Sequence, residues 1–559
     1  MKKILLYILM FAFSVNAFSQ KALKSPYGIW AGGPGCDMPF VRGFWVACKW
    51  AELEPEKGKF NWSILEDQIK QACKEGTSIG LIVDVGPDSP EWLYSNGVPK
   101  VFNSDHINSR GVSHLLKFPY YPYYFDPNYI KYWFKQIRTT ANWIGALPDS
   151  LRAGIVFVQT AEGTTGDEGP YKGVPLDAKY RFNEKDKKWV DLKVEAWKIY
   201  KGIYGSMNPP IQLLINSGNS QQYEGILDTL VPDAWKKSGH PGHIYQFNGE
   251  KAYFNSLKNQ IWQRSSTGEF RRFRSEMDET TNGWFKENHS QNMYWLNIFC
   301  LHYGLDIFRM GCHLLENPVY RPGLDFFSKY AGQKDPKDAI GAFSAMKDVL
   351  DAADKVRFPE SKYGTANPDN KDRFLAIVKE YEKFGARIGD IDHAIGGAMN
   401  NRRSKAINDV GYDLFDGNYE VFLNQLSPNQ TSIGWWNIGP EDEPYGRFAR
   451  SFDYANGKNT MYFILNKDFF SKQPNKGVTV RVVYLDKGTG KWSLQYNGKD
   501  GNVKTASTVS NTNSGNWKEI NVEINDGRFT GKGPKGADLM LNNESKEDAY
   551  FHMVELMRK

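Results

Sequence analysis

The sequence has few cysteines, no clustered basic charge and no long apolar run after its first residues. Its five cysteines among 559 residues show no metal-ligand spacing, so a cysteine-based zinc motif is excluded. The odd count leaves at least one thiol unpaired, and we expect mostly buried cysteines with one or two disulfides at most. The net charge of +6 is mildly basic, but no Lys/Arg cluster predicts a nucleic-acid partner.

The first twenty residues read as a secretory signal. Lys2 and Lys3 precede the apolar run 4–13, which is too short to span a bilayer, and small residues follow over 14–20. The first cysteine, Cys36, is too distant for a lipid-anchor signal. We therefore predict a signal peptide over 1–20, no membrane anchor, and a periplasmic or extracellular protein.

What the chain has in abundance is aromatic residues, at 14% of the sequence with 17 Trp and 30 Tyr. Aromatic rings offer flat apolar faces on which sugar rings stack, and large α/β cores and β-sandwiches also consume them. The composition is therefore compatible with a carbohydrate partner and with ordinary packing alike.

Short apolar runs alternate with helical patterns from Tyr27 to Met310, as in parallel α/β folds. Helical patterns cover 60–74, 128–143 and 193–204. The arrangement predicts a closed (β/α)₈ TIM barrel over 21–345, with an open doubly wound sheet as the alternative. The eight predicted strands are 27–32, 43–48, 78–84, 154–159, 211–216, 243–247, 270–275 and 304–309.

The remainder of the chain changes character twice. Amphipathic spacing predicts helices over 339–358 and 371–385, which we interpret as the last barrel helix and a helical extension packed on the barrel, the extension being assigned to 346–430. Alternating strands and Asn-Gly or Asp-Gly turns then predict an all-β sandwich of jelly-roll type over 431–559. We expect this module mainly to pack against the barrel, with carbohydrate binding as the alternative.

Two carboxylates follow predicted barrel strands. Glu162 comes after strand 154–159 and Glu276 after strand 270–275. Glycosidic bond cleavage needs such a pair, because one carboxyl protonates the leaving oxygen while the other attacks the sugar or activates water. Other acids stand close enough in sequence to replace either one: Asp167 and Glu168 for the first, Asp278 and Glu279 for the second.

Three motifs resemble clan A glycoside hydrolases, with family 42 β-galactosidases as the nearest comparison. Residues 50–62, WAELEPEKGKFNW, are similar to the second barrel strand and its loop in that clan. Pro90-Glu91-Trp92 after the third strand resembles the rim of its cleft. In the clan the fourth strand ends in Asn-Glu, whereas this chain has Ala161-Glu162, which places the usual contact to the sugar 2-hydroxyl in question.

The resemblance implies a retaining glycoside hydrolase with Glu162 as general acid/base and Glu276 as nucleophile. The substrate of the family cannot be carried over to this chain, and our own expectation is a β-linked galactoside of plant or algal origin. The alternatives are an inverting enzyme that uses Asp278 or Glu279 as base, and a polysaccharide-binding protein on an inactive barrel. We expect neither cofactor nor metal, since His240 and His243 lack further ligands. The predicted substrate contacts are Arg42, Trp50, Asp84, Asn216, Gln246, Asn248 and Trp284.

Overall fold

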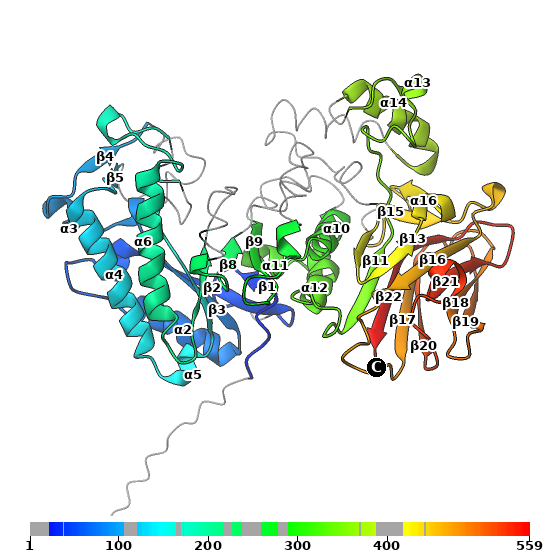
Figure 1. Ribbon diagram of the computed structural model, residues 1–559, viewed down its shortest axis with the longest axis horizontal. Coiled ribbons are helices and arrows are strands. Elements are labelled where there is room, and N and C mark those ends of the chain that lie inside the picture. The colour runs from blue at the N-terminus through cyan, green and yellow to red at the C-terminus, as the bar shows by residue number, and fades with distance from the viewer. Residues whose placement is uncertain are drawn as a thin grey trace, which may run out of the picture.

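A computed structural model gives the architecture of the chain (Figure 1). The structure describes residues 22–36, 38–104, 120–163, 169–171, 173–215, 226, 229–237, 259–277, 289–367, 370–386, 417–440 and 443–559. Within this part of the chain, no helix combines the length and apolarity that a membrane crossing requires.

Eight parallel strands close into a barrel, in the order β1-β10-β9-β8-β7-β6-β3-β2. This confirms the predicted barrel. The strands are β1 (Gly28–Ala31), β2 (Val41–Lys49), β3 (Ser78–Asp84), β6 (Ile155–Gln159), β7 (Gln212–Ile215), β8 (Trp235–Lys237), β9 (Arg272–Met277) and β10 (Ile307–Met310).

Helices surround the barrel, and local signals fix where they begin and end. Helix α2 (Ser63–Glu75) stops at Gly76, whose left-handed φ of 66° suits glycine. Helix α4 (Pro127–Gly145) begins after Asp126, whose carboxylate accepts hydrogen bonds from two backbone N–H groups. The other α-helices in the described part of this region are α1 (Trp50–Leu53), α3 (Trp92–Ser95), α5 (Asp149–Arg152), α6 (Lys187–Tyr204), α10 (His289–His302), α11 (Cys312–Leu315) and α12 (Arg321–Tyr330). Strands β4 (Lys100–Phe102) and β5 (Tyr120–Pro122) form a separate antiparallel pair.

One predicted strand differs from the structure. The sixth barrel strand is β8, Trp235–Lys237, which pairs with β7 and β9, whereas the predicted strand 243–247 lies outside the described residues. β8 is three residues long, and two of them are lysines. A segment so short and polar carries no apolar run for sequence analysis to detect.

Two antiparallel sheets form the C-terminal module and enclose a second core, which confirms the predicted all-β module. The seven-stranded sheet comprises β11 (Gly341–Ala345), β12 (Tyr419–Val421), β14 (Ile433–Trp436), β15 (Phe448–Ser451), β17 (Val478–Leu485), β20 (Trp517–Ile524) and β22 (Tyr550–Arg558). The five-stranded sheet comprises β13 (Leu423–Leu426), β16 (Thr460–Leu465), β18 (Lys491–Asn497), β19 (Val503–Ser510) and β21 (Leu539–Asn543), and the described helices of the region are α13 (Glu360–Tyr363), α14 (Lys371–Tyr381) and α16 (Pro428–Thr431).

The predicted helix over 339–358 is wrong. Residues 341–345 form β11, which pairs with β12 on one side and with β22 on the other, where Ser344 lies opposite Val554. All five residues of β11 are buried. Because a continuous apolar run suits a buried strand as well as a helix, only its distant partner strand decides between them. The predicted helix over 371–385 is confirmed as far as α14 extends.

The module packs on the barrel through α10 and α12, which lie between the two parts in Figure 1. The hydroxyl of Tyr294 on α10 is 3.0 Å from Nε2 of His552 on β22. Trp295 donates its indole N–H to the carbonyl of Gly446 at 3.0 Å. Around these buried hydrogen bonds, apolar side chains of the barrel and of the module pack into one continuous core. The module therefore packs against the barrel, as we expected.

Candidate active site at the barrel mouth

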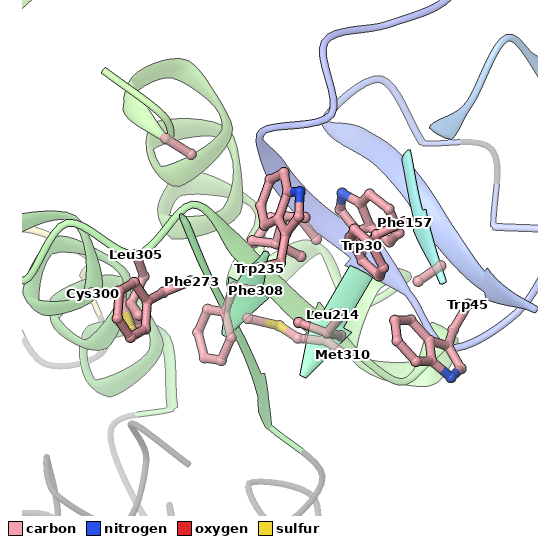
Figure 2. Close-up of a cluster of buried hydrophobic side chains, with 14 of the residues drawn as sticks. Trp30, Trp45, Phe157, Leu214, Trp235, Phe273, Cys300, Leu305, Phe308 and Met310 are labelled. Carbon is pink, nitrogen blue, oxygen red and sulfur yellow. The ribbon is translucent and has the colours of Figure 1, made fainter. Parts of the chain in front are cut away.

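The floor of the barrel is aromatic (Figure 2). Trp30 stacks on Phe157 with ring centres 5.3 Å apart, and Trp45 and Trp235 contact the same phenyl ring. Gly80 makes room for them, because a Cβ there would lie 2.7 Å from the Trp45 ring. The floor is therefore a packed layer, and any chemistry has to occur above it, at the carboxyl ends of the strands.

Glu276 lies above this floor near the end of β9, with 8% of its surface exposed. Arg274 donates to its carboxylate at 2.7 Å while its guanidinium covers the Trp45 ring. Lys237 from β8 lies 3.1 Å away and Arg309 from β10 lies 3.5 Å away. Three cations from three neighbouring strands thus surround one carboxylate and stabilise its negative charge.

Asp84 ends β3, on the opposite side of the barrel from β9. Burial and the nearby charge of Asp88 together raise the pKa of its carboxyl to about 7, against the opposing effects of Lys237, Lys49 and Arg309. Two of these cations, Lys237 and Arg309, also contact Glu276. Glu276 and its three cations form a charged cluster, and two of those cations also act electrostatically on Asp84. The role of Asp84 as a substrate contact stays a prediction.

Glu162 stands three residues beyond β6, and only 1% of its surface is exposed. Its carboxylate accepts a hydrogen bond of 2.6 Å from the indole N–H of Trp197 on α6. Burial raises the pKa of Glu162, and the charge of Lys193, also on α6, opposes that rise. The raised pKa suits a general acid, but these contacts hold the side chain against the helix layer. The role of Glu162 stays a prediction.

Two other predicted contacts lie away from the charged cluster. Trp50 is fully buried, donates to Glu54 at 2.8 Å and packs edge-on against Trp92, so it has no face for a sugar. Arg42 is the second residue of β2, at the amino end of the strand, where its side chain lies beside Gly28. Both positions correct the predicted substrate contacts in favour of packing. Asn216, Gln246, Asn248, Trp284, Asp167, Glu168, Asp278 and Glu279 lie outside the described residues.

Lys237 and Arg309 were not predicted as site residues. Arg309 is the last residue of a predicted strand, so the sequence did indicate its place at the carboxyl edge of the barrel. For Lys237 the sequence contains no such indication, because its strand was not predicted. Among the described residues, no group of three or more His, Cys, Asp or Glu side chains could hold a metal ion.

A disulfide closes the barrel at this face. Cys36, in the loop after β1, is bonded to Cys312, the first residue of α11 after β10, with Cα atoms 5.9 Å apart. β1 and β10 are neighbours, so the bond ties the loops of the first and last barrel strands together. Cys48, Cys73 and Cys300 are buried and not in disulfides, as expected.

No family model and no curated protein matches the chain. Among solved structures it is similar to a β-galactosidase from the psychrophilic Marinomonas ef1, with TM-score 0.36 and 10% identity over 54% of this chain and 59% of that one. It is also similar to the catalytic domain of a β-amylase from Paenibacillus polymyxa (TM-score 0.34, 9% identity, 56% and 99% covered). A third is the exo-β-1,4-mannosidase Op5Man5 from Opitutaceae bacterium strain TAV5 (TM-score 0.32, 11% identity, 56% and 62% covered). TM-scores this low do not support a shared function. The proposed function therefore rests on the residues at the carboxyl ends of the barrel strands.

Proposed function

We propose that this protein is an exported glycoside hydrolase that cleaves a poly- or oligosaccharide at the barrel mouth. The observation that carries the proposal is Glu276, a nearly buried carboxylate at a strand end that three cations keep charged. A carboxylate so placed can attack an anomeric carbon or activate a water, and a second carboxyl nearby can supply the proton. We assign it as the nucleophile of a retaining double displacement.

Two carboxyls compete for the role of acid. Glu162 has the raised pKa that an acid needs, but it is bonded to α6. Asp84 also has a raised pKa, and Lys237 and Arg309, which contact Glu276, act electrostatically on its carboxyl. Paired groups whose surroundings favour opposite protonation states are typical of acid and base partners. The position of Asp84 supports it as the stronger candidate of the two described residues.

The test compares Glu276→Gln, Glu162→Gln and Asp84→Asn on a panel of aryl and alkyl β-glycosides. Glu276→Gln should lose hydrolysis of every substrate to the background level. Loss of the acid should slow alkyl glycosides by about 10²–10⁴-fold and spare dinitrophenyl glycosides, whose leaving group needs no proton. Glu316→Gln, an exposed carboxylate after α11, is the matched control and should retain full activity.

Proton NMR of the first product separates the mechanisms. A retained anomeric configuration supports Glu276 as nucleophile, and an inverted one makes it, or a neighbouring acid, the general base. Full hydrolysis by Glu276→Gln would end the assignment.

A second candidate is a polysaccharide-binding protein without catalysis. The attachment of Glu162 to α6 favours it, because the carboxylate expected after the fourth strand is then not directed at the sugar. Wild-type protein that binds a polysaccharide but hydrolyses no member of the panel would support this alternative.

The β-galactoside substrate and the export of the chain are part of the same proposal. Support for export comes from the apolar N-terminal run and from the Cys36–Cys312 disulfide, since such bonds persist in oxidising compartments. Mass spectrometry of the secreted protein, with cleavage after about residue 20, would test it.

A further inference from the structure

The C-terminal module holds a second cavity, remote in sequence from the barrel mouth. Its volume is about 450 Å³, within the usual range of small-ligand sites. The segment 348–357 after β11, Tyr381 at the end of α14, α16 and Lys458 before β16 enclose it. None of these residues takes part in the proposed hydrolysis.

The wall of the cavity is held rigidly. Arg357 donates to both carboxylate oxygens of the buried Asp348, at 2.9 and 2.6 Å, and Arg450 binds the same carboxylate from behind at 3.2 Å. Arg357 also donates to the hydroxyl of Tyr381 at 3.1 Å. The Tyr381 ring in turn packs edge-on against Trp436. Such a network fixes the lining side chains before a ligand arrives, which lowers the entropy cost of binding.

Polar groups at the rim face the open space. Lys458 donates to the carbonyls of Asn429 and Ser432, at 3.0 and 3.2 Å, which accounts for two of the three protons of its ammonium group. Asn429 and Gln430 are exposed beside it, and the amide oxygen of Asn429 accepts hydrogen bonds of 3.3 Å from the buried Arg450. The cavity thus presents donors and acceptors side by side, as a ligand rich in hydroxyl groups requires.

Apolar surface completes the lining. Val356 is 88% exposed, more than any other large hydrophobic residue of the described chain, and it is one of the residues that line the cavity. Of the charged residues in the lining, Asp348 and Asp354 balance Arg357 and Lys458, which favours a neutral ligand over an anion. Sugars combine hydroxyl-bearing edges with apolar C–H faces, and this lining matches both.

We propose that this cavity binds a short stretch of a neutral polysaccharide and so anchors the protein to its substrate. The site is separate from the barrel mouth, and binding there does not depend on catalysis. Glu276→Gln should therefore bind as well as the wild type, so that failure of the hydrolase proposal and failure of this one can be told apart.

The experiment is affinity gel electrophoresis of the full chain in β-1,4-galactan, agarose, β-1,4-xylan and β-1,4-mannan. Two exposed positions are changed, Val356→Asp and Gln430→Ala, together with Lys458→Met. Each variant should lose about two- to tenfold in affinity for the retained polysaccharide, the scale of one lost hydrogen bond or apolar contact. Lys467→Met, an exposed lysine of the same module outside the cavity, is the control.

Unchanged melting curves would show that the variants are folded, and Val356→Asp is the safest of them because its side chain is in solvent. Activity on a soluble aryl glycoside should stay at the wild-type level in all three. Wild-type affinity in every variant would overturn the proposal. So would the absence of retardation of the wild type in all four polysaccharides, or retardation that sodium sulfate abolishes, which would indicate an anion site.

Discussion

The Cys36–Cys312 bond gives a prediction whose size follows from the fold. Replacing both cysteines by serine opens a covalent loop with a sequence separation of 276. The chain-entropy relation for a loop of that length gives about 5.6 kcal/mol at 25 °C as an upper value, and measured disulfides typically contribute about 2–4 kcal/mol. A barrel of about 300 residues has an unfolding entropy of about 0.6 kcal/mol/K, so its Tm should fall by about 3–6 °C.

Calorimetry at one scan rate measures this shift in the wild type and in the Cys36→Ser/Cys312→Ser variant. Dithiothreitol should lower the Tm of the wild type to that of the variant. It should leave the variant unchanged, because Cys48, Cys73 and Cys300 are not in disulfides. A fall of less than about 1 °C, or an equal effect of reductant on both proteins, would refute the claim that this bond constrains the unfolded barrel.

Three further changes test other parts of the barrel. Gly80→Ala should lower the free energy of unfolding by about 1–3 kcal/mol, because the added methyl group would overlap the aromatic rings of the barrel floor. Denaturant unfolding measures this loss, and an unchanged midpoint would contradict the packing of the floor. Lys334→Met should lower the free energy of unfolding by about 3–5 kcal/mol in the same assay, because it removes the ammonium group that lies 2.6 Å from the buried carboxylate of Asp306 in the wild type. A loss below about 1 kcal/mol would count against a stabilising ion pair. Asp84→Asn should raise the Tm at pH 8 and have little effect at pH 3. The pKa of this carboxyl is raised in the folded protein to about 7, so the wild type loses stability as pH rises from about 4 through 7, and a Tm difference that is independent of pH would contradict it.

The barrel could be predicted because six of its eight strands carry short apolar runs that are recognisable in the sequence alone. β8 and β11 could not. Lys236 and Lys237 make β8 look polar, and their place in the barrel follows from the strands on either side of them. β11 looks helical by spacing, and its partner β22 is distant in the sequence. Both errors concern segments whose structure depends on tertiary neighbours more than on their own residues.

The site was predicted in the same uneven way. Glu276 could be found because it ends a recognisable strand, and the strand period places Arg274 and Glu276 on one side of it. The same period explains the position of Glu162. Phe157 points into the barrel, so a residue five positions later, an odd number, falls on the opposite side if the alternation continues. The motif match ignored this parity. Lys237 could be recognised as a site residue only from the closed barrel, whereas Arg309 already stood at the end of a predicted strand.

The pairing of β11 with β22 has a consequence for how the module is made. A ribosome adding about 5–20 residues per second needs on the order of 10–40 s to produce the roughly 200 residues between these two strands. Throughout that interval β11 has no neighbour on the side that β22 occupies in the finished sheet, and an open strand edge invites aggregation. A polypeptide kept unfolded until it has crossed a membrane, as we propose for this one, would have both strands available together.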